Sequence, residues 1–175
     1  VIGDINADWK GGVYNTLTYK NFSLGFLIDM QKGGDVFSLD TWYGYATGLY
    51  DFTAGLNDLG NPVRNPVTTG ADSGGVILPG VQADGSTNDV RAYAGWYANP
   101  WGWARAANKQ HVYDAGFVKL REASITYSFT DKMLDKLPFT NASLSLIGRN
   151  LWIIDKNVPY ADPEAGLSSG NVQGY

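Results

Sequence analysis

The chain has 175 residues, of which 14% are aromatic, 17% are charged and 22 are glycine, and its formal net charge is −4. This charge argues against nucleic-acid binding, because no basic stripe is present to replace phosphate counterions. Cysteine is absent, which excludes disulfide frameworks and thiolate metal sites. No apolar run reaches the length of about 18 residues that a transmembrane helix needs. Many glycines and aromatics with few charges favour an all-β protein.

The first predicted elements are two strands, at 9–20 and 22–31, joined by a tight turn. Side chains alternate between the two faces of a strand, and every second residue from Phe22 to Met30 is apolar. The turn is predicted at the Lys-Asn pair, because Asn21 tolerates a positive φ. These residues predict a β-hairpin with one apolar face.

Residues 32–112 are predicted to form a long loop. They contain the turn-forming segments KGGD, DLGNPVRNP, TTGADSGG and ADGSTND and show no sustained periodicity. A structureless loop of this length is uncommon inside a compact soluble domain. Outer-membrane barrels, in contrast, carry short turns at one end and long external loops at the other.

Two further strands are predicted at 116–129 and 142–153, because polar and apolar residues alternate in both. Their polar faces carry Glu122 and Arg149, which we expect on the lumen face of a barrel. This pair either forms a cross-strand ion pair or lines the path of a solute. Residues 155–175 have the composition of a second external loop.

Short and long connections thus alternate along the chain, as they do in an outer-membrane barrel, where about 9–11 residues cross the bilayer at a tilt. The predicted fold class is all-β, part of a large antiparallel transmembrane β-barrel with long extracellular loops. Four strands cannot close such a barrel, and open edges in lipid would leave backbone groups unpaired. We therefore expect this chain to be a piece of a larger protein.

Three blocks of the sequence carry a family resemblance. They read IGDINADWKGGVYNTLTYKNFSLGFLIDMQKGGDVFS, GFVKLREASITYSF and LSLIGRNLWIIDKNVPYADPE. In their order and spacing, these blocks resemble the C-terminal barrel segment of SusC/RagA-type TonB-dependent transporters. The positions that match the family pattern are Asp8, Trp9, Gly11, Gly12, Phe117, Lys119, Leu120, Arg121, Glu122, Gly148, Arg149, Asn150, Leu151, Asp162, Pro163 and Glu164.

The resemblance implies a barrel of about 22 strands with an N-terminal plug, in the outer membrane of a Gram-negative bacterium. It implies energy supplied through TonB, a SusD-like surface lipoprotein as a lid, and oligosaccharides or peptides as substrates, without enzymatic activity. Residues 1–175 would then be the C-terminal segment of such a protein, and the plug and the final strand would lie outside this chain.

An aromatic stretch at 93–103 holds three of the six tryptophans. Flat aromatic rings can stack on sugar rings or grip a peptide, and a neighbouring arginine can pair with an acidic ligand. Packing among the loops or against the lid is the alternative interpretation. The candidate substrate-binding residues are Trp96, Tyr97, Trp101, Trp103 and Arg105.

The segment ADSGG mimics the nucleophile motif of trypsin-like proteases, with Ser73 as the nucleophile. A catalytic triad needs a histidine base, and those proteases place it far before the serine. The single histidine, His111, follows Ser73. A glycine-rich turn is therefore the better interpretation.

Two oxygen-rich groups are candidates for a loop Ca²⁺ or Mg²⁺. One is the segment 84–89, and the other combines Asp155, Asp162 and Glu164. The first lacks the glycine and the bidentate glutamate of an EF-hand loop, and Asx-turns explain the same residues. No other cofactor and no transition-metal site are predicted.

A secreted carbohydrate-binding β-sandwich with aromatic loops is the alternative function. It would need strands of about 5–6 residues with regular short spacing, and the apolar stripe from Phe22 to Met30 opposes it. A barrel enzyme such as an outer-membrane protease or lipase is a second alternative, which would need a histidine base beside an acid or serine on the rim.

Overall fold

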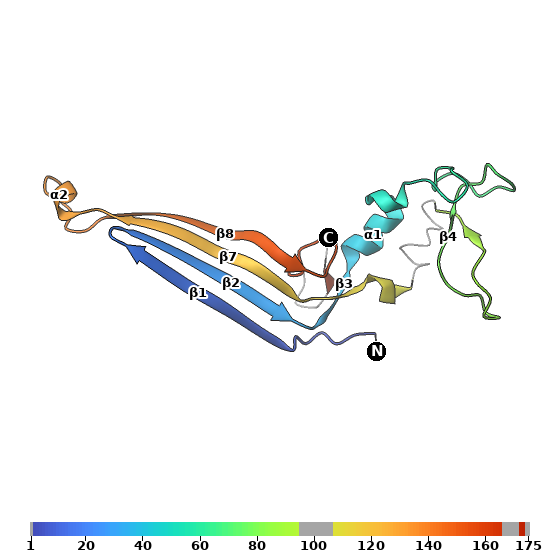
Figure 1. Cartoon of the computed structure of the whole chain (residues 1–175), viewed down its shortest axis with the longest axis horizontal. Coiled ribbons are helices and arrows are strands. Elements are labelled where there is room, and N and C mark those ends of the chain that lie inside the picture. Colours follow the sequence, from blue (N-terminus) through green and yellow to red (C-terminus); the bar gives the residue numbers. More distant parts are fainter. Residues whose placement is uncertain (1, 95–106, 166–171, 174–175) are drawn as a thin grey trace.

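The structure of the chain, a computed structural model, describes residues 2–94, 107–165 and 172–173. It is elongated, with a long sheet at one end and, at the other, an irregular module formed by residues 33–94 and 107–116 (Figure 1). The sheet has four antiparallel strands in the order β1-β2-β7-β8. Their bounds are β1 Trp9–Tyr19, β2 Phe22–Lys32, β7 Phe117–Ser128 and β8 Ser143–Lys156.

The strand ends differ slightly from the ranges that the alternating pattern predicts. The largest difference is in β8, which continues to Lys156, whereas the predicted strand ends at 153. The added residues reach into the predicted loop 155–175, because Lys156 remains opposite Phe117 of β7 in the ladder.

Short elements interrupt the region predicted to be one long loop. Helix α1 is capped locally: the Ser38 side chain accepts a hydrogen bond from the Thr41 amide, and Gly48 ends the helix with a φ of 80°. The sequence pattern did not predict α1, because a helix of 9 residues gives few repeats of the 3.6-residue period. The remaining elements are β3 Asp35–Ser38, α1 Leu39–Thr47, η1 Asp51–Thr53, β4 Val76–Ile77, β5 Arg91–Ala92, η4 Asn108–His111, β6 Val112–Asp114, α2 Asp131–Leu134 and β9 Val172–Gln173.

None of the helices in the described ranges has the length and apolarity needed to cross a membrane.

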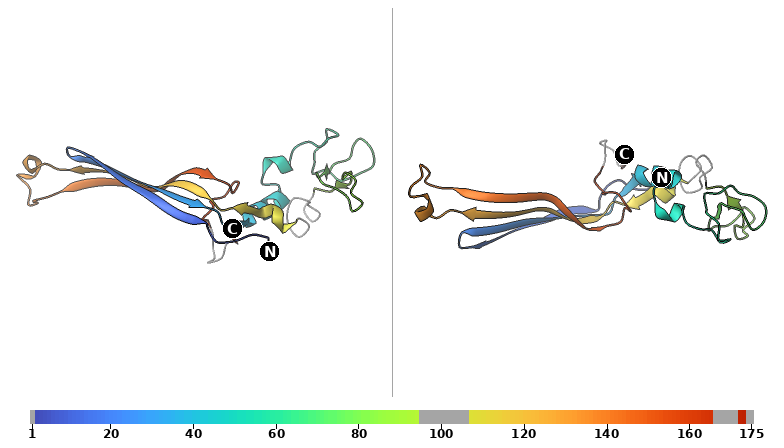
Figure 2. Two further views of the ribbon diagram at one scale, coloured as in Figure 1. Left: turned by 60° about the horizontal axis from the view of Figure 1, so that its bottom comes forward. Right: turned by 90° about the horizontal axis from the view of Figure 1, so that it is seen from above.

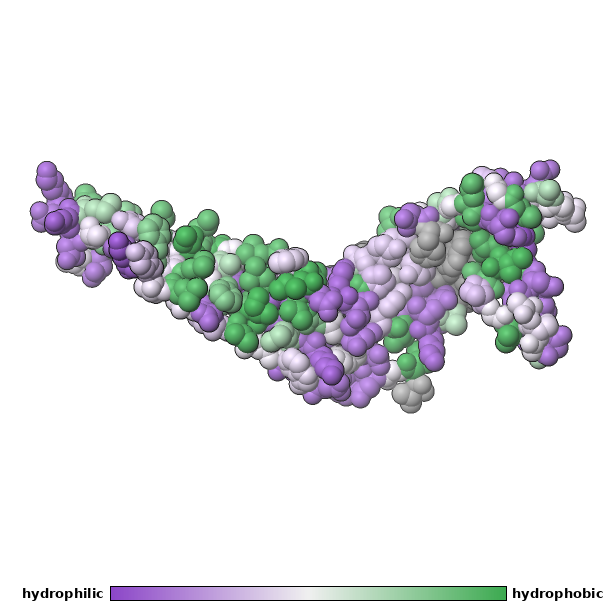
Figure 3. All heavy atoms as spheres, in the orientation of Figure 1, coloured by the Kyte–Doolittle hydropathy of each residue, from purple (hydrophilic) through white to green (hydrophobic). Residues whose placement is uncertain are grey.

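The four-stranded sheet has one apolar face. Leu24 of β2 lies between Leu17 of β1 and Ile125 of β7, and Ile125 lies opposite Leu146 of β8. All four side chains are exposed, and Figure 3 shows apolar residues gathered over the middle of the sheet. No other part of the described chain covers this stripe.

The opposite face of the sheet carries most of the polar side chains, together with Leu27 and Ile147. The hydroxyls of Thr18 and Ser23 hydrogen-bond at 3.1 Å, and those of Thr126 and Ser145 at 2.8 Å. Both pairs are cross-strand neighbours, so polar groups satisfy one another along this face.

The hairpin between β1 and β2 turns at the predicted pair, but with the roles of its residues exchanged. Lys20, not Asn21, has a positive φ, of 53°. Asn21 instead joins the hairpin to β7: its side-chain amide donates to the Ser128 carbonyl at 2.8 Å, and its own carbonyl accepts from the Ser128 amide.

A small core lies where the sheet meets the irregular module. Val36 of β3, Ala115, Val158 and Ala161 are buried together, and Tyr113 of β6 packs against them. β3 pairs antiparallel with β6 and parallel with β9. The chain after β8 therefore returns to the module, as the two views in Figure 2 show.

Candidate functional site

Charged side chains gather on the polar face of the sheet, at its junction with the segment 157–165. At their centre is Lys119 of β7, whose side chain is only 3% exposed. Its ammonium group pairs with Asp162 and, at 2.6 Å, with Glu164. These residues, together with Asp29 and Arg121, are called the charged cluster below.

Arg121 joins the strands of the charged cluster. Its guanidinium pairs with Asp29 of β2 and, at 2.7 Å, with Glu164, and it donates to the Asn150 side chain of β8 at 3.1 Å. Arg121 can reach all three because the register shifts between Leu120 and Glu122, as in a β-bulge. Lys119 and Arg121 thus pair with carboxylates of this chain on the polar face.

The other side of the bulge is formed by Asn150 and its neighbours in β8. Asn150 has a φ of 49°, a conformation that asparagine adopts more readily than most residues. Gly148 leaves space for Leu151, since a Cβ at Gly148 would lie 2.7 Å from a methyl carbon of Leu151. Gly148 and Asn150 of the GRNL block thus allow the backbone conformation that β8 adopts opposite Arg121.

Replacing Asn150 tests this backbone requirement. Asn150→Val and Asn150→Gly both lose the hydrogen bond to Arg121, but only valine adds the steric penalty of a left-handed conformation, about 1–2 kcal/mol. The valine variant of the full-length protein is expected to unfold at a lower temperature than the glycine variant, measured by the heat-dependent shift in gel mobility. Equal midpoints would contradict the strain argument.

Glu122 and Arg149 form the predicted cross-strand ion pair. They are directly opposite in the ladder between β7 and β8, and Arg149 Nε lies 3.0 Å from a Glu122 carboxylate oxygen. Because the Arg149 side chain is 74% exposed, the pair is solvated and contributes about 0–1 kcal/mol. Their position on the lumen face of a barrel stays a prediction.

Asp162 is held in its charged form. Burial alone would raise its pKa, but hydrogen bonds from Lys119 and from the Glu164 amide, with the nearby charges of Lys119 and Arg121, outweigh burial and lower the pKa below the ordinary value. Ionised Asp162 therefore stabilises the fold above the ordinary carboxyl range. That contribution is lost as the pH falls through the lowered pKa.

Acid is accordingly expected to loosen the segment 157–165. In the full-length protein, hydroxyl-radical footprinting of Tyr160 should show increasing reactivity as the pH falls below about 4, the ordinary carboxyl pKa. In Asp162→Asn the acid-induced change should shrink, because the titrating group is gone. An identical rise in that variant would assign the change to another group.

Several of the candidate cation ligands are engaged by protein groups. Asp162 and Glu164 pair with Lys119, and Asp84 accepts hydrogen bonds from the amide and the hydroxyl of Ser86, as in an Asx-turn. Within the part of the chain that the structure describes, no group of three or more histidine, cysteine, aspartate or glutamate residues could hold a metal ion.

The protease-like serine belongs to a turn. The buried Ser73 hydroxyl accepts from the Thr68 amide at 3.1 Å and donates to the Gly74 carbonyl at 3.2 Å. His111 is also fully buried, and its Nδ1 lies 3.0 Å from the Thr41 hydroxyl. These contacts agree with the interpretation of ADSGG as a turn.

The five candidate substrate-binding residues fall outside the residues that the structure describes, which stop at 94 and resume at 107. Their role stays a prediction. They are Trp96, Tyr97, Trp101, Trp103 and Arg105.

An aromatic contact that the sequence did not reveal lies beside the charged cluster. The rings of Tyr50 and Tyr160 stack at 3.8 Å with an interplanar angle of 14°, and Tyr45 meets Tyr50 edge-on at 5.4 Å. Burial raises the pKa of Tyr50 and that of Tyr45, so both phenols stay neutral. No pattern in the sequence predicts a contact between residues as distant in the chain as Tyr50 and Tyr160.

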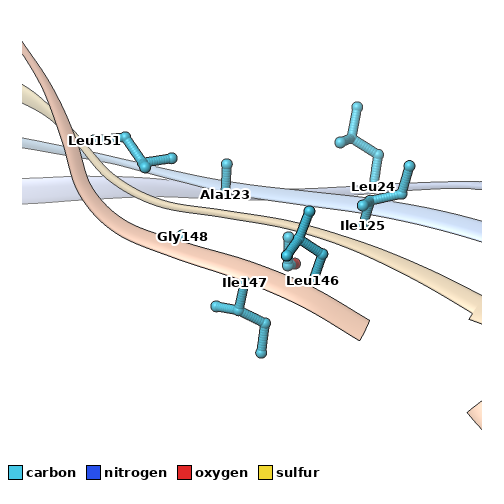
Figure 4. Close-up of a pocket in the computed structure, with 8 residues that line it drawn as sticks. Leu24, Ala123, Ile125, Leu146, Ile147, Gly148 and Leu151 are labelled. Carbon is cyan, nitrogen blue, oxygen red and sulfur yellow. The ribbon is translucent and has the colours of Figure 1, made fainter. Parts of the chain in front are cut away.

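The apolar face also carries a shallow depression, at the opposed pair Ala123 and Gly148. Figure 4 shows Leu24, Ala123 and Ile125 on one side of the ribbon and Ile147 on the other. The depression exists because two small residues meet in the ladder. It offers almost no polar group to a ligand, so it belongs to the apolar face rather than to a binding site.

Comparisons with known proteins agree with the sequence motifs. The chain is 27% identical over 173 residues to TonB-dependent receptor P3 of Formosa agariphila, covering 99% of this chain and 14% of that protein. It is 25% identical to TonB-dependent receptor P39 of the same organism, again covering 14% of that protein. No family model matches. The chain thus spans about one seventh of the length of these curated relatives.

Solved structures show the same fold. The RagAB peptide importer in its 'closed-closed' state matches 93% of this chain and 15% of the importer chain, with a TM-score of 0.52 and 18% identity. In the 'open-open' state the TM-score is 0.50. The predicted fold class, part of a large antiparallel barrel, is confirmed. These proteins are named as receptors and importers rather than enzymes. The predicted resemblance is therefore confirmed, and this chain is similar along nearly its whole length to a segment of the SusC/RagA-type TonB-dependent receptors.

Proposed function

We propose that this chain forms part of the wall and the outer loops of a TonB-dependent importer in the outer membrane of a Gram-negative bacterium. The importer takes up oligosaccharides or peptides together with a SusD-like surface lipoprotein. The observation that carries the proposal is the two-faced sheet, which exposes an apolar stripe on one side and pairs hydroxyls and charges on the other.

Both faces suit a barrel wall. Lipid would cover the apolar face, on which aromatic side chains lie near both ends: Tyr19 and Phe22 at the hairpin, Trp9 and Trp152 toward the module. Aromatic girdles at two interfaces are typical of outer-membrane barrels. The polar face would line the lumen, with Glu122 beside the solute path.

Energy and cargo recognition depend on more than this segment. TonB coupling would act through parts of the protein beyond this chain. Trp96, Trp101 and Trp103 are proposed to contact cargo from an outer loop, since flat aromatic rings bind sugar rings and peptides. The RagAB neighbours are named as peptide importers, which supports peptides as one of the two cargo classes.

The secreted β-sandwich is not favoured. A sandwich buries the apolar face of each sheet against a second sheet, and here Leu17, Leu24 and Leu146 are exposed on a face that no other described segment covers. In a membrane barrel, this apolar stripe would face the hydrocarbon of the lipid.

Membrane fractionation of the native, full-length protein tests the proposal. We expect a heat-modifiable outer-membrane protein that co-purifies in detergent with a surface lipoprotein. Deletion of its gene should abolish uptake of either defined oligosaccharides or defined peptides, while a passive-porin substrate still enters. A soluble protein without a lipoprotein partner would refute the importer and favour the binding module.

A further inference from the structure

The segment 157–165, called the strap below, connects the sheet to the irregular module. Its Val158 and Ala161 are buried with Val36 of β3 and with Ala115. Lys156, the last residue of β8, donates to the Ala161 carbonyl at 2.7 Å. In Figures 1 and 2 the strap follows β8 and lies where the sheet meets the module.

At the sheet, the strap is held by charge. Asp162 and Glu164 both pair with Lys119, and Glu164 also pairs with Arg121. Both carboxylates are 41% exposed, whereas the Lys119 side chain is 3% exposed. Lys119 is therefore the buried member of these pairs, and the strap carboxylates are the exposed ones.

At the module, the strap is held by the stacking of Tyr160 on Tyr50, and the backbone of Tyr160 is strained. Tyr160 has a φ of 64°, which is rare for a bulky residue and persists only where the surrounding structure enforces it. Tyr160 as a whole residue is 56% exposed, yet its ring stacks on the buried Tyr50. The anchors on both sides of Tyr160, at Val158 and at Asp162, supply the constraint.

Tyr50 begins a turn that hydrogen bonds also support. Its hydroxyl donates to the Asp40 carbonyl at 3.3 Å, and the Thr53 amide and side chain bond to the Tyr50 carbonyl. Arg64 holds the same turn from another direction, donating to the carbonyls of Tyr45 and Thr53 at 3.2 and 3.0 Å. The strap thus adds the stacked ring of Tyr160 to these hydrogen bonds and to the edge-on contact of Tyr45.

We propose that Lys119 is a positioning residue that fixes the turn at 48–53 through the strap, by holding Asp162 and Glu164 so that Tyr160 stays stacked on Tyr50. A residue on the sheet thereby sets the position of a segment in the outer module. This inference concerns the fold and stands independently of transport. Its consequence, that the charged cluster holds the outer loops at the lumen mouth, rests on the proposed function.

Hydrogen exchange of the full-length protein in detergent tests the proposal at two separate places. In Lys119→Met, amide exchange should rise at least tenfold both in the strap and in residues 48–53, where the Leu49 and Thr53 amides are hydrogen-bonded. Lys119→Arg, which keeps the charge, should restore most of the protection. Arg149→Met, which breaks the exposed ion pair on the same face, should leave both segments unchanged.

Each result decides the proposal. Faster amide exchange in the strap with unchanged exchange in residues 48–53 would show that the strap does not position the turn. Unchanged exchange in both segments would show that Lys119 does not hold the strap. If Lys119→Met fails to assemble, Tyr160→Ala tests the link from the other end. It should release 48–53 while Glu164 stays protected, and unchanged protection of 48–53 would overturn the inference. Uptake is not measured, so failure here is distinct from failure of the importer proposal.

Discussion

Arginine in place of Leu24 is expected to lower the free energy of unfolding of the full-length protein in lipid by about 1–2 kcal/mol, between the costs at the interface and at the bilayer midplane. Leu24 lies in the apolar stripe, between Leu17 and Ile125 in the ladder, at a depth between the two sets of aromatic side chains. In the proposed barrel this position faces hydrocarbon, where a guanidinium is poorly solvated. Urea unfolding in phospholipid vesicles measures the effect.

Ser23→Arg is the matched control, one position away on the same strand. Ser23 lies opposite Thr18 and Thr126 on the polar face, so arginine there should extend into water and change stability by about 0.5 kcal/mol or less. Equal losses for the two variants would mean that the apolar face does not meet lipid. A larger loss for Ser23→Arg would invert the proposed faces.

Removing both strap carboxylates, by Asp162→Asn with Glu164→Gln, is expected to make local opening of the strap easier by about 3–5 kcal/mol. The double variant leaves the Lys119 ammonium, on a side chain that is 3% exposed, without its anionic partners. A buried cation without a counter-charge is costly. Exposure of both carboxylates to solvent places the expected value near the lower end. Native-state hydrogen exchange gives the opening free energy directly.

A third substitution separates the buried charge from the lost hydrogen bonds. Adding Lys119→Met to the double variant removes the uncompensated cation, so much of the lost protection should return although no ion pair is restored. If the triple variant opens as easily as the double variant, the penalty comes from the missing hydrogen bonds of the strap, and the buried charge is not its cause.

The strands and their faces could be predicted because the information is local. Because side chains alternate with a period of two, Ser23 and Leu24 must lie on opposite faces of the sheet. The same rule predicts Glu122 and Arg149 on the polar face of neighbouring strands. The ion pair between them followed from that placement. Such predictions need only a short window of sequence and a turn.

The charged cluster could not be predicted in the same way, since it depends on a register shift and on contacts between distant residues. Strict alternation would put Glu122 and Lys119 on opposite faces of β7. The bulge at Arg121 brings Glu122 and Lys119 onto the same, polar face. The pairing of Lys119 with Asp162 spans 43 positions. The family motif marked these residues, but no pattern in the sequence indicated that they touch.

The bulge has a consequence for changes in strand length. Relative to β2, β7 carries one additional residue at Arg121, while the ladder on either side stays aligned. Deleting Arg121 would therefore leave Lys119, Leu120 and Glu122 in regular alternation, each on its present face. Deleting Leu120 would give a strand of the same length, but arginine would then occupy the apolar position. Deletion of Arg121 would therefore lose its pairs with Asp29 and Glu164 but keep the remaining side chains on their faces, whereas deletion of Leu120 would also place an arginine on the apolar face.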